Sequence, residues 1–296
     1  MKKIFAGLLF LMVLLVFFSC SQQGELTDPG TDQLDGSIYQ RPEFIETRTD
    51  AEIERYLLKA SDSYTPERKK PQPPNPPDPP EDPNPNPAHK YAYIVGISDY
   101  DGTQNDLQYC DDDAQDWKNY LQTQGFTIQF DIDQNATASA IESGLQWLMT
   151  SAAPGDEIAF IYSGHGVDYA QYGTCIISCD LYYITHSFVM EYLSLSNCTK
   201  KMVAIDCCYA GDFLGDSETG MIVATASTNS YSYDGDETMQ NGVWTYYYMV
   251  ALVDNEVIFN EDAAGYAKTQ MKAWGRTYHV RVTPAVNDDY DGYFDI

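Results

Sequence analysis

From residue 91 onward, the pattern of apolar and polar positions alternates between strand-like and helix-like periodicity. Short apolar runs predict buried strands at 91–97, 126–132, 156–164, 200–208 and 220–227. Between and after them, apolar residues recur at helical spacing and predict helices at 111–125, 137–152, 186–196, 242–253 and 261–275. Strands that alternate with helices build a largely parallel sheet covered on both faces. We therefore predict an α/β domain over residues 89–296, with about six strands in a mostly parallel central sheet.

The chain before this domain has a different composition. Residues 43–60 carry apolar side chains spaced as in a short helix, too small to fold alone. Residues 71–87 contain no apolar side chain except proline, which predicts an extended polyproline-type spacer. We accordingly divide this part into a tether or pro-segment at 20–70, with one short helix, and a proline-rich linker at 71–88.

The first residues have the pattern of an export signal. Lys2 and Lys3 precede an apolar run over 4–18, and a small residue stands directly before Cys20. The run is too short for a comfortable membrane span, and FFSC resembles the lipobox of bacterial lipoproteins. We expect residues 1–19 to be a signal peptide and Cys20 to be lipidated, which anchors the protein in the bacterial cell envelope. The alternative is an ordinary cleaved signal with an incidental cysteine.

The charge balance excludes one class of partner. The chain has 44 acidic and 17 basic side chains and a formal net charge of −27. Nucleic-acid binding rests on neutralising phosphates with Lys and Arg, so we expect no nucleic-acid partner. A cationic peptide would instead be attracted.

The cysteines allow two interpretations. Beyond Cys20 there are six, an even number that suggests disulfides in an exported protein. A domain of this size needs no disulfides for stability. Adjacent cysteines on a strand point to opposite faces, which also argues against a disulfide framework. No spacing of cysteine and histidine suggests zinc. A catalytic thiol is therefore the competing interpretation.

Two predicted strands end in residues that carry chemistry. In sheets of this kind, ligands bind beyond the carboxyl ends of the strands. His165 follows one strand in SGHG, and Cys207 and Cys208 follow another in DCCYAG. A thiol attacks a carbonyl only as thiolate, and a neighbouring imidazole can remove its proton. The backbone N–H groups of Gly166 and of the nucleophile are candidate donors to the oxyanion. A packing role is the alternative for His165, but its flanking glycines argue against it.

These motifs, in this order, resemble the caspase and metacaspase clan, whose cysteine motif usually reads DSCHSG. The resemblance extends from YAYIVGISDYDGTQNDLQYCDDDAQDW through NGVWTYYYMVAL to TPAV, roughly residues 90–285. It implies a caspase-like three-layer sandwich, with Cys208 as nucleophile and Cys207 at the position of the small residue. It also implies a protein that is a monomer, as metacaspases are.

The resemblance also implies a specificity for basic residues. Metacaspases cleave after Arg or Lys, and the matching pocket positions are Cys110, Asp113, Ser163 and Asp206. Carboxylates at the bottom of a cleft hold a guanidinium or ammonium by charge-assisted hydrogen bonds and reject acidic side chains. We therefore expect substrates to be proteins or peptides with Arg or Lys at the cleavage site.

The sequence departs from the family at two places. Tyr209 and Ala210 replace the usual His-Ser after the nucleophile, which we expect to alter a loop rather than the chemistry. Many metacaspases need calcium, and Asp180 and Asp216 match two of its acidic ligands, but Thr185-His186 stands where an acidic pair is expected. We therefore predict no metal and no cofactor.

The favoured hypothesis is a membrane-tethered cysteine endopeptidase with a Cys208–His165 dyad. Its candidate autoprocessing site is Arg68-Lys69-Lys70, in an exposed stretch before the linker. Two alternatives stay open: an inactive relative that binds peptides or acts as a scaffold, and an amidase or peptide ligase that uses the same dyad. No Lys or Arg lies between Lys118 and Lys200. This fits either self-protection of a basic-specific protease or simply an acidic composition.

Overall fold

The computed structural model describes residues 38–66 and 82–296, and a six-stranded sheet runs through the second of these ranges. The strand order is β10-β9-β8-β4-β2-β3, and within 82–296 this sheet is parallel except where β10 pairs antiparallel with β9. The mostly parallel sheet is thereby confirmed. Its strands are β2 (Lys90–Gly96), β3 (Thr127–Ile132), β4 (Glu157–Ser163), β8 (Lys200–Asp206), β9 (Met221–Thr225) and β10 (Ala285–Asp288).

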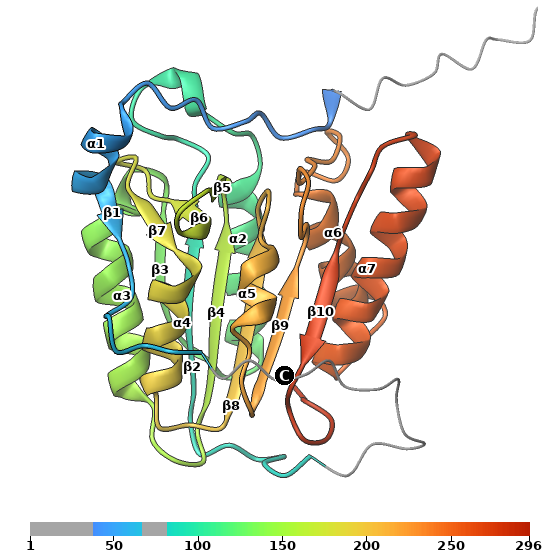
Figure 1. Cartoon of the computed structure of the whole chain (residues 1–296). Helices are drawn as coiled ribbons and strands as arrows, with labels where there is room; N and C mark the ends of the chain where they lie inside the picture. Colours follow the sequence, from blue (N-terminus) through green and yellow to red (C-terminus); the bar gives the residue numbers. More distant parts are fainter. Residues whose placement is uncertain (1–37, 67–81) are drawn as a thin grey trace, which may run out of the picture. The chain divides into compact units, whose positions relative to one another are not determined.

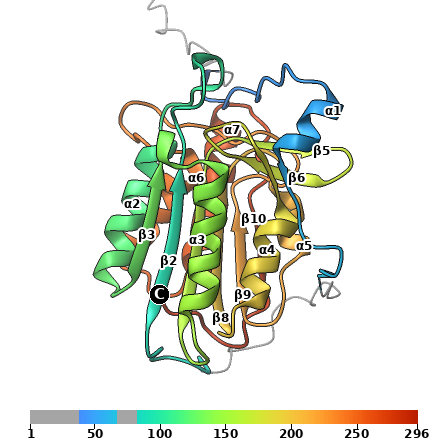
Figure 2. The same cartoon turned by 90° about the vertical axis from the view of Figure 1, so that its left-hand side faces the viewer.

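Helices cover both faces of this sheet, which confirms the three-layer sandwich (Figures 1 and 2). Successive side chains of a strand point to opposite faces, so Ala92 and Ile94 pack on one side while Tyr93 and Val95 pack on the other. One face carries α2 (Cys110–Thr123), α6 (Val243–Met249) and α7 (Asn260–Thr277), and the other carries α3 (Ala138–Ser151), α4 (His186–Leu195) and α5 (Gly211–Gly215). Helix α6 continues as a π-helical turn over Val250–Asp254, and short 3₁₀ turns lie at Thr103–Asn105 and Asp133–Asn135.

A second, smaller sheet was not predicted from the sequence. Its order is β1-β7-β6-β5, formed by β1 (Leu57–Leu58), β7 (Tyr183–Thr185), β6 (Gly173–Ile177) and β5 (Gly166–Tyr169). Strand β5 begins at Gly166, the last residue of the histidine motif, so the small sheet lies beside the carboxyl end of β4. Its strands are short, and only tertiary pairing distinguishes them from loops.

Residues 38–66 lie against the domain, where the sequence suggested a tether. Their helical part is short: α1 spans Asp50–Ile53, and a 3₁₀ turn follows over Glu54–Tyr56. Ile53 is buried, and β1 pairs in parallel with β7. Figure 1 shows this segment in blue, crossing the carboxyl ends of the central strands. The segment therefore passes over the edge where ligands bind in sheets of this kind.

A buried lysine secures the opposite edge of the sheet. Lys200, the first residue of β8, places its Nζ 2.9 Å from Asp82 Oδ2 and 3.8 Å from Glu157 Oε2, and it also contacts Asp295. Burial raises the pKa of Glu157 to about 7. Because Asp82 belongs to the end of the predicted linker, this cluster fixes both the entry of the chain into the domain and its last residues.

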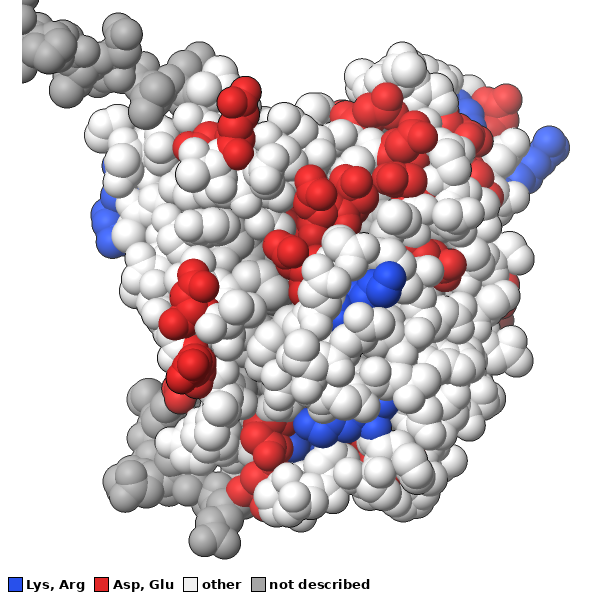
Figure 3. Space-filling model, turned by 180° about the vertical axis from the view of Figure 1, so that it is seen from behind, with Lys and Arg blue, Asp and Glu red and all other residues white. Residues whose placement is uncertain are grey.

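The described residues include no helix that is long and apolar enough to cross a membrane. Acidic side chains dominate the charged surface on the face shown in Figure 3, in line with the composition. The predicted signal peptide, Cys20 and the basic triplet Arg68-Lys69-Lys70 lie outside the described residues.

Removing the Lys200 ammonium should destabilise the domain. In a Lys200→Met variant Asp82 and Asp295 would lose their cation, and the buried Glu157 would keep only Lys90, whose Nζ lies 3.3 Å away. Breaking a buried ion pair from one side costs about 3–5 kcal/mol. Urea unfolding followed by circular dichroism measures this loss. Lys272→Met is the matched control, because Lys272 is exposed on α7 and its replacement should change stability by less than ~0.5 kcal/mol. Equal stability of the two variants would contradict a structural role for the cluster.

Candidate active site

Parallel pairing brings the two chemical motifs to one edge of the sheet. In the register of β4 and β8, Ser163 stands opposite Asp206, so His165 and Cys208 each follow two residues later. Gly166 lies directly against the cysteine motif: a Cβ at this position would lie 2.2 Å from the Cys208 carbonyl oxygen and 2.4 Å from Cys207 Sγ. Only glycine fits there, which explains the small residue after the histidine.

The His165 side chain is buried and oriented by the backbone. It is 2% exposed, and its Nε2 lies 2.8 Å from the carbonyl oxygen of Asn105. A carbonyl only accepts, so Nε2 carries the hydrogen and Nδ1 keeps its lone pair. The Tyr100 hydroxyl oxygen accepts the backbone N–H of His165 at 2.8 Å. Burial lowers the pKa of His165 to about 4, so the imidazole is a neutral base at neutral pH.

The Cys208 thiol lies in a tight, polar turn. Its Sγ is 3.2 Å from the backbone nitrogen of Ser232, which donates to it, and the residue is 3% exposed. Tyr209 follows with a φ of 55°, in the left-handed region, and donates its N–H to the Ser230 carbonyl. Burial raises the pKa of Cys208 to about 11, so it is a thiol at neutral pH. Attack would need a base, and in the described part of the chain no hydrogen bond yet joins Cys208 to His165.

Cys207 occupies a different environment. It is fully buried in the apolar core between β8 and the small sheet, and burial raises its pKa well above the ordinary value. All six cysteines in the described region are free and buried, so none of them forms a disulfide in this structure. The strand therefore separates the two neighbours: one is a core residue, and the other stands in the turn.

The predicted pocket residues converge beyond the same strand ends. Asp113 accepts hydrogen bonds from Ser163 Oγ at 2.6 Å and from the Gly242 N–H at 2.8 Å. Asp206 accepts from Ser232 Oγ at 2.6 Å and from Thr245 Oγ1 at 2.8 Å. Burial and the neighbouring Asp206 raise the pKa of Asp113 well above its usual range. The fourth predicted residue, Cys110, is buried at the start of α2 beside them.

Two further pocket residues escaped the sequence analysis. Asp234 supplies a third carboxylate from the loop after β9. Gly242 forms a wall of the pocket: a Cβ there would lie 2.6 Å from Asp206 Oδ2 and 2.9 Å from Asp113 Oδ2. Asp234 lies among several acidic residues with no distinguishing pattern, whereas Gly242 is the second residue of the NGVW motif and could have been noticed there.

The pocket is occupied by a side chain of the protein itself. The Arg41 guanidinium contacts all three carboxylates. Its Nε lies 2.7 Å from Asp234 Oδ1, its Nη2 lies 3.1 Å from Asp113 Oδ2, and its Nη1 lies 3.1 Å from Asp206 Oδ1. The residue is 1% exposed. Its backbone N–H also donates to the Ser232 carbonyl at 3.1 Å. The sequence analysis did not single out Arg41.

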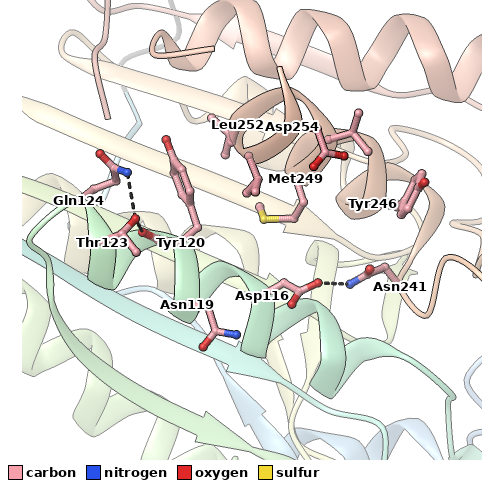
Figure 4. Close-up of a pocket in the computed structure, with 12 residues that line it drawn as sticks. Asp116, Asn119, Tyr120, Thr123, Gln124, Asn241, Tyr246, Met249, Leu252 and Asp254 are labelled. Carbon is pink, nitrogen blue, oxygen red and sulfur yellow. Dashed lines mark hydrogen bonds between the residues drawn. The ribbon is translucent and has the colours of Figure 1, made fainter. Parts of the chain in front are cut away.

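A small cavity lies at the carboxyl ends of the strands, and a larger one lies on the flank of the domain. A cavity of about 240 Å³ is lined by Glu43, Phe44, Gly166 and Cys208, among others. A larger one of about 550 Å³ lies between α2 and α6, where Asn241 Nδ2 donates to Asp116 at 3.1 Å (Figure 4). None of the predicted catalytic or pocket residues lines the larger cavity. The predicted nucleophile Cys208 and Gly166 line the smaller cavity, which is therefore the candidate catalytic cleft.

The two residues that match calcium ligands of metacaspases have partners within the protein. Asp180 accepts a hydrogen bond from the Ala138 N–H at the start of α3, and Asp216 lies 2.6 Å from His186 Nδ1. Among residues 38–66 and 82–296, no group of three or more His, Cys, Asp and Glu side chains is arranged to hold a metal ion.

Sequence comparison finds that the chain is similar to metacaspases. Metacaspase-1 of Debaryomyces hansenii is 38% identical over 88 residues, 26% of this chain and 20% of the relative. Metacaspase-4 of Arabidopsis thaliana is 27% identical over 171 residues, 51% of this chain and 40% of the relative. The chain thus matches less than half the length of each of these relatives.

A solved structure and a family model extend the comparison. A crystal structure of a Geobacter sulfurreducens protein superposes with a TM-score of 0.55 at 15% identity, covering 68% of this chain and 94% of that one, which shows the fold. The model of the caspase domain matches residues 89–273, more than half of the chain. The chain therefore belongs to the caspase-domain family.

Proposed function

We propose that this protein is a cysteine endopeptidase that cleaves peptide bonds after Arg and, less efficiently, after Lys. The observation that carries the proposal is the Arg41 guanidinium bound by Asp113, Asp206 and Asp234 beside the cysteine and histidine motifs. A cleft that binds an arginine of its own chain in this way suits the same side chain in a substrate.

The chemistry begins with proton transfer. The neutral His165 takes the proton of the Cys208 thiol through Nδ1, and the sulfur attacks the carbonyl carbon after the basic residue. The backbone N–H groups of Gly166 and Cys208 stabilise the oxyanion. The imidazolium then gives its proton to the departing amine, and water hydrolyses the thioester. Because the Asn105 carbonyl binds Nε2–H, it keeps the ring in the tautomer that this sequence of steps requires.

The pocket sets the order of preference among substrates. A planar guanidinium reaches three carboxylates at once, whereas a lysine ammonium is a single point of charge. An acidic side chain would meet like charges in a buried site. Arg should therefore be preferred over Lys, and Asp should be rejected.

The proposal includes the setting of the enzyme. The signal-like N-terminus with Cys20 supports a lipid-anchored protein of the cell envelope, and the acidic surface supports basic peptide partners. The family resemblance supports a monomer that needs no cofactor, and Arg68-Lys69-Lys70 remains the candidate autoprocessing site.

Peptide hydrolysis tests the activity. Residues 21–296, as the natural sequence and as Arg41→Ala, are incubated under reducing conditions with reporter peptides that end in Arg, Lys or Asp. We expect cleavage after Arg and Lys only. Cys208→Ala should abolish it, while Cys207→Ala should retain it. Replacing both Asp113 and Asp206 with Asn should lower kcat/KM for the Arg peptide by at least about 100-fold, since each buried charge-assisted contact contributes about 1.5–3 kcal/mol. No cleavage by either chain, with or without calcium, would refute the activity.

The low pKa of His165 gives a second prediction. An NMR titration should find its imidazole neutral down to about pH 4. Below pH 6.5 the unfolded chain binds a proton that the folded chain does not, so lowering the pH reduces stability by up to ~1.4 kcal/mol per unit until about pH 4. Urea unfolding of the natural chain and of His165→Gln measures the difference in slope. An imidazole that titrates near pH 6.5 would contradict its buried, neutral state.

A further inference from the structure

The segment that carries Arg41 continues across the dyad. Before the arginine, the Asp234 N–H donates to the Tyr39 carbonyl at 2.7 Å, and Gln40 pairs antiparallel with Tyr233. After it, the Phe44 ring lies 5.5 Å from the His165 ring, centroid to centroid, and the Ile45 N–H donates to Asn105 Oδ1 at 2.8 Å. The chain thus binds on both sides of the point where a nucleophile and a base would act.

We propose that residues 39–45 are a built-in inhibitor that binds as a substrate binds, with Arg41 in the specificity pocket and the Arg41–Pro42 bond at the position of the scissile bond. This inference rests on the proposed function, because it takes the acidic pocket as the substrate pocket. An added strand that pairs through its backbone while its side chains enter pockets is a known mode of peptide recognition.

Pro42 explains why the bound segment is not a substrate. The bond after Arg41 is a tertiary amide, whose nitrogen carries the proline ring in place of a hydrogen. The ring occupies space beside the nitrogen that the imidazolium must reach to protonate the leaving group. Proline also holds the preceding residue in an extended conformation, which suits the antiparallel pairing of Gln40 with Tyr233 and the hydrogen bond from Arg41 N–H to the Ser232 carbonyl. The segment therefore has the features of a good ligand with a poor bond to break.

Contacts beyond the dyad hold the inhibitor in place. Tyr231 donates its hydroxyl hydrogen to the Glu43 carboxylate, which closes the chain over the small cavity. Arg48 pairs with Glu46 at 2.7 Å and donates to the Leu181 carbonyl at 2.7 Å. Strand β1 then joins β7. Because the segment is part of the chain, its effective concentration at the cleft is high, and a cut between residues 66 and 82 would remove that advantage.

The Arg41 contacts should dominate the binding. Without the guanidinium, three carboxylates would face one another in a buried site, and removing one partner of a buried ion pair is strongly unfavourable. Arg41→Ala should therefore release the segment and expose Cys208.

Alkylation of Cys208 measures this release without relying on peptidase activity. Residues 21–296 are treated with iodoacetamide, and modification of Cys208 is followed by peptide mass spectrometry. Arg41→Ala should raise the alkylation rate at least about 10-fold, while Arg55→Ala, an exposed arginine of the same segment, should not change it. Equal rates in the natural and Arg41→Ala chains would overturn the inference even if both chains cleave peptides. Release without peptide cleavage would instead count against the proposed function.

A synthetic peptide of residues 38–47 tests the mode of binding in trans. It should protect Cys208 of the Arg41→Ala chain from alkylation and remain intact, and the same peptide with Pro42→Ala should be cut after Arg41. A peptide that fails to protect, or a Pro42→Ala peptide that protects but stays whole while other Arg peptides are cut, would contradict substrate-like binding. Circular dichroism and urea unfolding show whether the Arg41→Ala variant is folded. If it is not, protection of Cys208 by the peptide is measured in the Glu43→Ala variant instead.

A separate observation extends the inference to a second subsite. The Tyr39 ring, two residues before Arg41, lies 5.7 Å from the Trp274 ring and 5.0 Å from the Tyr278 ring, both in edge-to-face geometry. Tyr233 also contacts Trp274. Because this aromatic group lies at the end of α7, next to the paired backbone, we infer that it selects an aromatic residue two positions before the basic one.

The same protection measurement tests this subsite. Protection of Cys208 should require an about 10-fold higher concentration of the Tyr39→Ala form of the 38–47 peptide than of the natural peptide. One aromatic pair adds about 0.5–1.5 kcal/mol beyond the contribution of the area that the ring buries. Tyr278→Ala in the protein should reduce the difference between the two peptides. Equal protection by the natural peptide and its Tyr39→Ala form would show that the ring contacts contribute nothing to recognition.

Discussion

The parallel register of β4 and β8 is the constraint on which the site depends. It sets Ser163 beside Asp206, and the candidate site follows from these two positions: His165 and Gly166 come after one strand, Cys208 comes after the other, and the acidic pocket lies between them. A slip of one residue would turn each strand's side chains to the opposite face. The apolar cores on both faces of the sheet therefore fix the site as firmly as they fix the fold.

Buried clusters of charged side chains lie at both ends of the central strands. At the amino ends of the strands, Lys200 faces acidic partners that secure the chain's entry and its end. At the carboxyl ends, three carboxylates converge and one arginine from residues 38–66 satisfies them. Buried charges of one sign are costly unless paired, so an acidic pocket of this kind favours a cationic ligand from any source. In this structure the source is the chain itself.

The protonation states of His165 and Cys208 are those that the proposed enzyme would have while the segment covers its cleft. Burial lowers the pKa of His165 to about 4 and raises that of Cys208 to about 11, so both groups are neutral at neutral pH. Phe44 and the chain around it contribute to that burial, since they cover the imidazole. Departure of the segment would let water reach both groups and bring their pKa values closer together.

Apolar periodicity and local motifs, which neighbouring residues along the chain define, were enough to predict the alternation of strands and helices and the two strand ends that carry chemistry. The four predicted pocket positions came only from the resemblance to metacaspases. Tertiary structure decided the rest: the small sheet, the third carboxylate Asp234, the orienting Asn105 carbonyl and the position of Arg41. A backbone carbonyl has no sequence signal, and an arginine in a short segment of mixed apolar and polar residues has no local feature that reveals its partners. Such contacts depend on residues far apart in the chain meeting in space, as Arg41 and Asp113 do at a separation of 72.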